Sequence, residues 1–153
     1  ENAARVPLII AVPRSEVAGE VVAAPAEMVD FYPTLSEICN LPPPKSLAGV
    51  SLAPALKNPR VSPRDSALTQ YASGYSLRTD RYRYTEWGEM GVDGAELYDH
   101  ESDPPEMVNL ASRPKYAETA SQLSKLLHER IKQAKRPPQG VRQIRFENRR
   151  REG

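Results

Sequence analysis

The sequence contains little of what the common classes of enzyme and membrane protein need. Cys39 is its one cysteine, so the chain forms no internal disulfide and no cluster of thiolate metal ligands. His100 and His128 are its two histidines. No stretch reaches the roughly 18 consecutive apolar residues of a membrane-spanning helix, and we find neither a glycine-rich phosphate loop nor a zinc-binding pattern. The residues therefore give no signature of a disulfide scaffold, a zinc domain or a membrane span.

Glycine is also scarce, with 8 residues, whereas proline is abundant, with 15. Proline at this density favours loops and irregular connections over long regular elements. The 153 residues suffice for one ordinary domain, or for one domain and part of another. The hydrophobic content of 39% supports only a modest core. Because the chain opens with Glu1 and Asn2 and has no initiating methionine, we expect a processed product or one segment of a longer protein.

Residues 66–110 have the pattern of an antiparallel meander. Four short runs, separated by Gly, Asp or Pro and mostly rich in tyrosine and threonine, predict strands. They span residues 66–71, 75–79, 81–87 and 95–100. Side chains alternate between the two faces of a strand. In the third run, alternation therefore places Arg81, Arg83 and Thr85 on one face and Tyr82, Tyr84 and Glu86 on the other.

The clearest helical period lies in residues 114–135. Apolar side chains recur there at spacings of three and four, which gives one buried stripe. The stripe consists of Tyr116, Ala120, Leu123, Leu127, Ile131 and Ala134. Pro137 and Pro138 end the helix. About four strands with one amphipathic helix across a face make a compact α+β layer.

The first 64 residues predict less regular structure. Residues 6–13 are an apolar run flanked by prolines, which is typical of a strand covered on both faces. We expect a helix over residues 31–40, capped by Asp30, with Leu35, Ile38 and Cys39 on its buried face. A strand followed by a helix is half of an α/β unit, which cannot bury both faces of a sheet alone. Residues 41–64 carry six prolines and predict an extended connector.

The side chains that could act in catalysis each have a structural interpretation. His128 lies beside the apolar stripe of the last helix and is interpreted as a helix-surface residue. His100 stands among carboxylates, but alternation puts Asp99 and Glu101 on the opposite face of the strand. These groups therefore do not converge on one metal ion, and a structural role at the strand end is favoured. Cys39 is interpreted as a buried, inert thiol, since no basic side chain is near it in sequence to lower its pKa.

Arginine and aromatic side chains are concentrated on the predicted sheet. We take Arg78, Arg83 and Trp87 as candidates for residues near an anionic substrate, because a guanidinium binds sulfate or carboxylate through two parallel hydrogen bonds. The alternative, which the sequence alone favours, is a tyrosine-rich sheet packed beneath the last helix with its arginines in solvent. Both interpretations are open at this stage.

The C-terminal end is basic. Residues 135–153 contain seven basic side chains against two acidic ones, a net charge of +5. A charge of this kind attracts nucleic-acid phosphates, but the segment has a single aromatic residue, Phe146, for contacts with bases. We interpret it as a solvated or subunit-contacting end and expect no nucleic-acid partner.

Several motifs, met in one order along the chain, resemble the type I sulfatases, which are formylglycine-dependent members of the alkaline-phosphatase superfamily. The resemblance covers roughly residues 1–130, and residues 74–79 and 82–87 are similar to the iduronate-2-sulfatase branch. Arg14 stands where the family often has glycine. The motifs are Arg5-Val6-Pro7-Leu8-Ile9-Ile10, Met28-Val29-Asp30-Phe31-Tyr32-Pro33-Thr34-Leu35, Leu47-Ala48-Gly49-Val50-Ser51-Leu52, Arg78-Thr79-Asp80-Arg81-Tyr82-Arg83-Tyr84, and Glu96-Leu97-Tyr98-Asp99 through Asp103-Pro104 to Asn109-Leu110.

The resemblance implies an α+β fold, the C-terminal subdomain of a sulfatase. Its four-stranded antiparallel sheet packs on one amphipathic helix and is preceded by the last strand–helix unit of the large α/β domain. We expect residues 1–55 to belong to that catalytic domain with its connector and residues 56–135 to form the subdomain. Residues 136–153 are then a basic tail.

The resemblance also implies that the chemistry lies outside this chain. The family's nucleophile is a formylglycine made from a C/S-x-P-x-R motif, and Cys39, followed by Asn40, Leu41 and Pro42, does not fit that motif. Calcium is implied as a cofactor held by residues outside this chain. We therefore assign no catalytic and no metal-binding residue here, and expect the isolated chain to be inert.

The expected partners are the N-terminal sulfatase catalytic portion and a sulfated sugar or glycan, similar to iduronate 2-sulfate. The resemblance implies a secreted, periplasmic or lysosomal location. Two alternatives remain. One is a non-catalytic domain that binds anionic glycans, and the other is part of a related phosphoester or phosphonate hydrolase.

Overall fold

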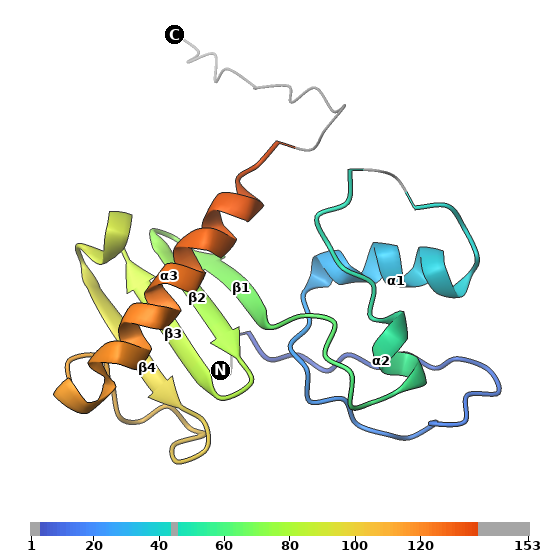
Figure 1. Cartoon of the computed structure of the whole chain (residues 1–153), viewed down its shortest axis with the longest axis horizontal. Coiled ribbons are helices and arrows are strands. Elements are labelled where there is room, and N and C mark those ends of the chain that lie inside the picture. The colour runs from blue at the N-terminus through green and yellow to red at the C-terminus, as the bar shows by residue number, and fades with distance from the viewer. Residues whose placement is uncertain (1–3, 44–45, 138–153) are drawn as a thin grey trace, which may run out of the picture.

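A four-stranded antiparallel sheet dominates the second half of the chain (Figure 1). The computed structural model describes residues 4–43 and 46–137. The strands are β1 (Ser66–Tyr71), β2 (Gly74–Thr79), β3 (Tyr82–Trp87) and β4 (Gly94–Asp99), and they lie in the sheet in chain order. Each strand pairs with the next in sequence, so the sheet is a simple meander. The predicted strands are confirmed, with ends that move by one residue at most.

One helix, α3 (Ala117–Ala134), crosses one face of the sheet (Figure 1). It follows a short 3₁₀ turn, η3 (Pro114–Tyr116). Leu77, Tyr84 and Leu97 are register partners in neighbouring strands and point toward this helix, where they meet Leu123 and Leu127. Burial of such side chains is the main favourable term in folding. The predicted apolar stripe is confirmed for all its members except the exposed Ala134.

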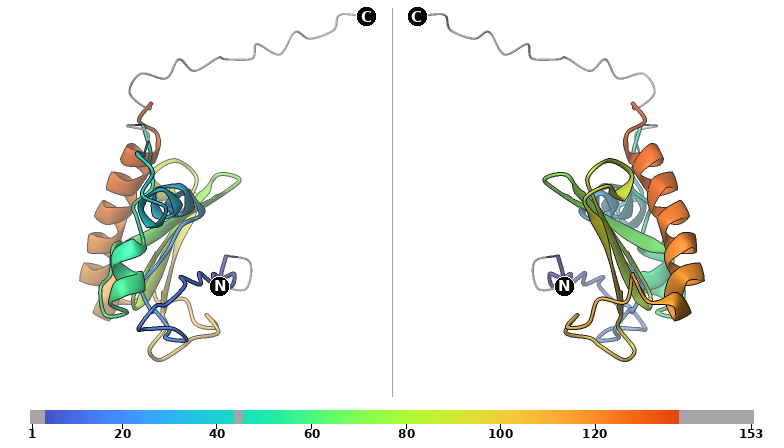
Figure 2. Two further views of the ribbon diagram at one scale, coloured as in Figure 1. Left: turned by 90° about the vertical axis from the view of Figure 1, so that its right-hand side faces the viewer. Right: turned by 90° about the vertical axis from the view of Figure 1, so that its left-hand side faces the viewer.

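The opposite face of the sheet is polar. Alternation puts Ser76 and Arg78 of β2 on this side, with their register partners Thr85 and Arg83 of β3. The side views in Figure 2 show α3 along one side of the sheet only. Arg81 is not part of this face pattern, because it precedes β3 and its guanidinium binds Asp99. The prediction of one face for Arg81, Arg83 and Thr85 is therefore right for the last two residues and wrong for Arg81.

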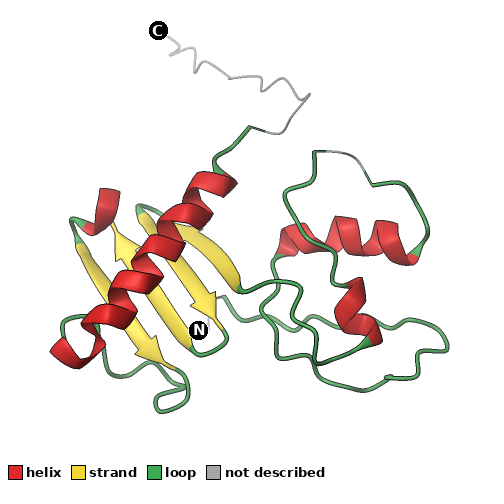
Figure 3. Ribbon diagram, in the orientation of Figure 1, coloured by secondary structure: helices red, strands yellow, loops and turns green. Residues whose placement is uncertain are grey.

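The first half of the chain consists mainly of loops (Figure 3). It holds the 3₁₀ turn η1 (Met28–Asp30), the helix α1 (Phe31–Ile38) and a short helix α2 (Ala53–Lys57). Helix α1 confirms the helix predicted over residues 31–40. Helix α2 was not predicted, because its five residues include Pro54 and lie in a stretch punctuated by proline. A further 3₁₀ turn, η2 (Glu89–Gly91), lies between β3 and β4.

The strand predicted for residues 6–13 is wrong for this chain. These residues have no regular structure and are mostly exposed, with Ile9 at 88%. A strand needs a hydrogen-bonded neighbour, and none of the described strands pairs with this segment. Arg14, just beyond it, has a φ of 61°, the left-handed conformation that favours glycine. The backbone here thus keeps a conformation that suits the glycine of the resembled family.

The buried face predicted for α1 is also wrong. Cys39 is exposed and Leu35 is 54% exposed, whereas Thr34 and Ser36 are buried. The Thr34 hydroxyl explains this orientation, since it donates to the backbone oxygen of Asp30 and accepts from the backbone N–H of Leu52 at 2.8 Å. Helix α1 therefore turns its polar side toward the rest of the chain and leaves its apolar side open.

A buried ion pair between Asp30 and Arg64 joins the two halves. The side chains are 0% and 3% exposed, and Arg64 Nε lies 2.9 Å from Asp30 Oδ2. Asp30 also accepts from the backbone N–H groups of Glu27 and Val50, at 2.8 and 2.9 Å. It does not cap α1 with its side chain, contrary to the prediction. Its carboxylate instead connects its own segment, residues 27–30, with Val50 and with Arg64.

Glu27 extends this junction to the sheet and to α3. Its carboxylate accepts from the backbone N–H of Leu68 in β1 at 2.7 Å and contacts Arg130 of α3 and Arg64. The chain passes very close nearby, because a Cβ on Gly49 would lie 2.0 Å from the backbone oxygen of Val29. Only glycine fits at that position.

The domain boundary predicted near residue 55 stays a prediction, and the predicted tail of residues 136–153 lies outside the described residues except for Arg136 and Pro137.

Replacement of Asp30 by asparagine tests the junction. The substitution keeps the size of the side chain but removes the charge that faces Arg64, and breaking a buried pair costs about 3–5 kcal/mol. Since Glu27 still contacts Arg64, we expect the free energy of unfolding at pH 7, measured by urea denaturation, to fall by about 3 kcal/mol. The matched control is Asp65→Asn, at an exposed carboxylate beside Arg64. Equal losses in the two variants would contradict the assignment.

The junction also makes stability depend on pH. Burial raises the pKa of Asp30. The hydrogen bonds from Arg64 and from two backbone N–H groups lower the pKa by more than burial raises it, so it lies below its ordinary value of 3.8. A carboxyl with a lowered pKa in the folded state stabilises the fold above its ordinary pKa and loses this effect as the pH falls. The unfolding free energy of the wild type should therefore fall more steeply below pH 4 than that of Asp30→Asn.

Candidate functional site

The three residues proposed from the sequence lie on the polar face of the sheet. Arg78 of β2 and Arg83 of β3 are direct register partners. Trp87 lies further along β3 on the same face, at an even spacing from Arg83. The fold thus brings these residues to one surface, on the side opposite α3.

Arg83 is buried and held by a carboxylate. Its Nε lies 2.6 Å from Glu106 Oε1, and its Nη1 lies 3.4 Å from the hydroxyl of Ser76. The same hydroxyl accepts a hydrogen bond from Thr85 at 2.9 Å. Burial raises the pKa of Glu106, but the hydrogen bonds that it receives, including those from His100 and Arg83, lower it to well below its ordinary value. Glu106 is therefore an ionised partner for Arg83 at neutral pH.

Arg78 holds the turn between β2 and β3. Its Nη1 donates to the backbone oxygens of Thr79 and Asp80, the latter at 3.0 Å. Its Nη2 lies 3.1 Å from Nδ1 of His100. Arg78 is half-buried. The alternative interpretation, with the arginines in solvent, is thus wrong for Arg83 and right only in part for Arg78.

Trp87 is held at both ends of its ring system. The indole Nε1 donates to Glu96 Oε1 at 3.0 Å. A Cβ on Gly74 would come within 2.5 Å of the ring carbon Cε3 of Trp87. The indole therefore lies flat on the β2 backbone, and Gly74 is the residue that permits this contact.

The pairing of Arg78 with Arg83 needs compensation, because like charges directly opposite each other on a sheet are destabilising. Glu106 neutralises Arg83, and His100 accepts from Arg78 while it contacts Glu106 at 2.8 Å. Trp87 contacts a second carboxylate, that of Glu96, so this face holds charges of both signs. Among its groups the guanidiniums are the ones whose chemistry suits an anion.

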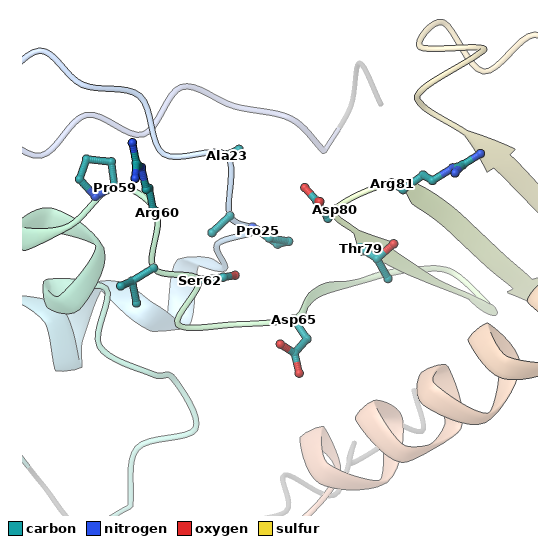
Figure 4. Close-up of a pocket in the computed structure, with 11 residues that line it drawn as sticks. Ala23, Pro25, Pro59, Arg60, Ser62, Asp65, Thr79, Asp80 and Arg81 are labelled. Atoms are coloured by element: carbon teal, nitrogen blue, oxygen red, sulfur yellow. The ribbon is translucent and has the colours of Figure 1, made fainter.

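A groove of about 510 Å³ lies next to this cluster, between the two halves of the chain. Figure 4 shows it between the segment of Ala23 and Pro25, the connector of Pro59 and Arg60, and the β2–β3 turn. Asp80 and Arg81 of that turn form one wall. The groove carries Asp65 and Asp80 as well as Arg60 and Arg81, so its charge is mixed. By itself it has no preference for an anion.

A second polar cluster, which sequence reasoning missed, lies beneath α3. Glu86 of β3 is buried and accepts from Tyr84 at 3.0 Å and from Ser124 at 2.6 Å, and its other oxygen lies 2.7 Å from His128 Nε2. Burial and the hydrogen bond to Glu86 raise the pKa of Tyr84 to about 12. The signal in the sequence was the spacing of Ser124 and His128, which puts both on one helix face. His128 therefore faces the sheet and is not a plain surface residue.

This second cluster does not have the arrangement of a nucleophile with its base. Ser124 donates to Glu86, which is also the residue that His128 contacts. Activation of a serine needs a base that accepts the hydroxyl proton and is in turn oriented by a third group. Burial raises the pKa of Glu86. The hydrogen bonds from Ser124, His128 and Tyr84 lower the pKa by more than burial raises it, so it lies below its ordinary value. Glu86 is thus an ionised anchor that ties α3 to β3.

A metal ion was expected only outside this chain. Within residues 4–43 and 46–137 no group of three or more His, Cys, Asp or Glu side chains is placed to hold one. The described residues therefore do not fit the calcium that the resemblance implies, and we derive no step through it for this chain. No helix of the described part is long and apolar enough to cross a membrane.

Comparison with known proteins identifies the family. Residues 1–133 match the family described as "N-sulphoglucosamine sulphohydrolase, C-terminal". The chain is 31% identical over 147 residues to an N-acetylglucosamine-6-O-sulfatase of Bacteroides thetaiotaomicron, covering 88% of this chain and 26% of the relative. It is 33% identical over 140 residues to arylsulfatase K of Gallus gallus, covering 83% and 26%. The chain belongs to this family and is the C-terminal portion of a type I sulfatase.

The fold agrees with this assignment. A protein solved in complex with its substrate D-glucosamine-2-N,6-O-disulfate shares 30% of its sequence with this chain and superposes with a TM-score of 0.63, over 69% of this chain and 24% of that one. The chain spans about a quarter of the length of the curated relatives that it matches. The predicted family and the α+β fold are confirmed.

Replacement of Glu86 by glutamine tests the anchor beneath α3. The substitution keeps the shape but removes the charge that His128 and the hydroxyls face, and loss of a hydrogen bond to a charged group costs about 1.5–3 kcal/mol. We expect a loss of unfolding free energy in this range and faster amide hydrogen exchange along α3. The control is Glu118→Gln, at an exposed carboxylate of the same helix. A stability equal to that of the wild type would contradict the anchoring role.

Proposed function

We propose that this chain serves a sulfatase that hydrolyses sulfate esters on sugars, and that it contributes the C-terminal part while the reacting groups lie outside it. The observation that carries the proposal is the family match over residues 1–133, together with relatives whose names are those of sugar and aryl sulfatases. The described residues contain neither a serine beside its own base nor a metal cluster. This chain would then help to shape the substrate pocket and would contact the substrate.

The exposed apolar side chains of the first half support a catalytic portion as partner. Helix α1 and η1 expose Met28, Tyr32 and Leu35, and the segment before them exposes Val6 and Ile9. Apolar patches of this kind are rare on isolated domains and mark contact surfaces. We infer that residues 1–55 pack on the N-terminal catalytic portion. The subdomain of residues 56–135 would be joined to the catalytic portion through residues 1–55.

The finer chemistry follows the same inference. The nucleophile would be a formylglycine, activated with the help of calcium, and both would be held by residues outside this chain. The substrate would be a sulfated sugar or glycan similar to iduronate 2-sulfate. The support is the resemblance of residues 74–79 and 82–87 to that branch, together with the relatives named as sulfatases of sugars.

Arg78, Arg83 and Trp87 are our candidates for residues near the substrate. What supports them is their common face, on which the two arginines are register partners. Arg83 is largely enclosed by Glu106 and Ser76, so it would order the surface beneath a ligand. Arg78 is more accessible and carries the stronger expectation of direct contact with an anion. Trp87 supplies an apolar surface beside them.

The isolated chain should not turn over a chromogenic aryl sulfate. We expect no coloured phenol above the rate without protein, with or without added calcium, because the nucleophile lies outside these residues. The full-length sulfatase is the positive control. Turnover by the isolated chain that a chelator abolishes would refute the proposal. Persistent heparin affinity of the folded chain, with no activity in the full-length protein, would favour the glycan-binding alternative.

Replacement of Arg78 by alanine in the full-length sulfatase tests the anion contact. Loss of a hydrogen bond between charged groups corresponds to about a tenfold to hundredfold effect. We expect KM for a sulfated sugar to rise by about tenfold with a smaller change in kcat. Arg113→Ala, at an exposed arginine after β4, is the control. An unchanged KM, or a loss of folding that leaves the kinetics of the remaining folded protein normal, would assign Arg78 to structure alone.

A further inference from the structure

The polar face of the sheet carries an aromatic row at one end. Tyr71 of β1 is the register partner of Gly74 in β2, and Trp87 of β3 is the register partner of Gly94 in β4. The indole of Trp87 lies over Gly74, so these four positions form one row across the sheet. Two aromatic side chains alternate with two glycines in this row. The row lies at the end of the sheet where the β1–β2 turn and the β3–β4 loop leave it (Figure 1).

The aromatic rings of this row are presented on the side of the sheet that α3 does not cover (Figure 2). Tyr71 is 77% exposed, and Trp87 is half-buried. Because one face of the indole rests on the β2 backbone, its opposite face points away from the sheet. A Cβ on Gly94 would meet nothing within 4 Å in the described part of the chain, so the surface is open on the β4 side of the indole. Tyr71 and Trp87 are two strands apart, which is roughly 10 Å.

A row of hydroxyls and one carboxylate lies next to the aromatic row. Thr69, Ser76, Thr85 and Glu96 are successive register partners across the four strands. Thr69 is exposed. The Ser76 hydroxyl accepts from Thr85 at 2.9 Å and so still has a proton to donate. This row therefore offers hydrogen-bond donors and acceptors directly beside the aromatic rings.

Glu96 joins the two rows. Its Oε1 accepts from the indole Nε1 of Trp87 at 3.0 Å, and its Oε2 lies 3.4 Å from the hydroxyl of Tyr98. Each carboxylate oxygen has two lone pairs and therefore keeps the capacity to accept a further hydrogen bond. The negative charge attracts hydroxyl donors and repels a sulfate group at this position. The surroundings of the indole thus suit a ligand that is uncharged and rich in hydroxyl groups.

We propose that Tyr71 and Trp87 form a stacking platform for an uncharged sugar ring, whose hydroxyl groups bind Glu96 and the hydroxyls of the adjacent row. A pyranose has C–H groups on its faces and hydroxyls around its edge. The electron-rich faces of aromatic rings attract such C–H groups, and Tyr and Trp supply this contact with little loss of conformational freedom. A protein partner is matched less well, because the centres of protein interfaces are depleted in charged side chains such as Glu96.

The link between this platform and a sulfated substrate rests on the function proposed above, whereas sugar binding itself does not. The arginine pair lies two residues beyond the hydroxyl row along the strands, which is roughly 7 Å. A glycan with one ring on the platform can therefore extend its next sugar toward the arginines. The platform holds the uncharged neighbour of the sulfated sugar in this arrangement.

The first test uses Trp87, which is the one tryptophan of the chain. Its fluorescence and its indole N–H signal in a proton–nitrogen spectrum therefore report on the platform alone. The 153-residue chain is titrated with uncharged tetrasaccharides of glucose, of galactose and of N-acetylglucosamine. We expect a saturable change in both signals with at least one of them. No change with any of the three would overturn the proposal.

The second test removes the exposed ring of the row. We expect Tyr71→Ala to bind the tetrasaccharide about tenfold more weakly, as the loss of one aromatic contact predicts. Tyr32→Ala is the matched control, because Tyr32 is a 57% exposed tyrosine of α1. Trp87 remains the reporter in both variants, and thermal unfolding checks that both are folded. Equal affinity of the folded Tyr71→Ala variant and the wild type would overturn the platform.

The third test addresses the carboxylate. Glu96→Gln keeps the shape of the side chain and an acceptor for the indole, but removes the charge. We expect about tenfold weaker binding of the uncharged tetrasaccharide, since hydrogen bonds to a charged group are the stronger ones. A purely structural role of Glu96 predicts a change in thermal unfolding with no change in affinity. That outcome would overturn the binding of sugar hydroxyls by Glu96.

Kinetics of the full-length sulfatase separate the platform from the proposed function. We expect Tyr71→Ala to raise KM about tenfold for a sulfated tetrasaccharide and to leave KM for a sulfated monosaccharide unchanged. An unchanged KM for both would overturn the link to catalysis. If the full-length protein hydrolyses no sulfate ester, the proposed function falls, while the fluorescence titration still decides the platform. Loss of stability by Tyr71→Ala in the full-length protein but not in the 153-residue chain would make the row a protein contact and overturn the proposal.

Discussion

The buried ion pair of Asp30 and Arg64 is the interaction on which the arrangement of this chain depends. Asp30 accepts from the backbone at Glu27 and Val50 and from the Arg64 guanidinium, so one carboxylate orders three segments. Glu27 carries the connection to β1. Without charge on Asp30, loops rich in proline would have few regular hydrogen bonds to place them. The groove between the halves is lined by Pro59, Arg60 and Ser62 of the connector, close to this junction.

The sheet separates two physically different environments. On one face Leu77 and Leu97 of the sheet and Leu127 of α3 are fully buried. Glu86 of β3 anchors α3 there through Ser124. On the other face polar side chains bond to each other, with Arg83 almost buried among them. A polar face that is satisfied internally stays ordered without a covering helix. The anion contact that we propose for this face relies on that order.

The comparisons place the chain among the C-terminal portions of sulfatases, and the contacts describe what such a portion offers. Its first half exposes apolar side chains that this chain alone does not cover, such as Ile9 and Leu35. Its second half presents Arg78 next to His100, which also contacts the carboxylate of Glu106. In our proposal docking and substrate contact fall to different halves, which the Asp30–Arg64 pair keeps together.

The sequence by itself determined the elements whose signal is local. The alternation of β3, the tight turn at Asp80 and the three-four spacing of α3 act within a few residues, so the meander, its helix and the family were predicted correctly. The strand over residues 6–13 and the buried face of α1 were wrong, because each depends on a neighbour and not on the segment itself. The three candidate residues were predicted, but whether they bind a substrate stays a prediction. Only the tertiary structure decided that His100 meets Arg78 and Glu106, and that Asp30 binds Arg64, since these contacts join positions whose separation along the chain leaves no periodic trace.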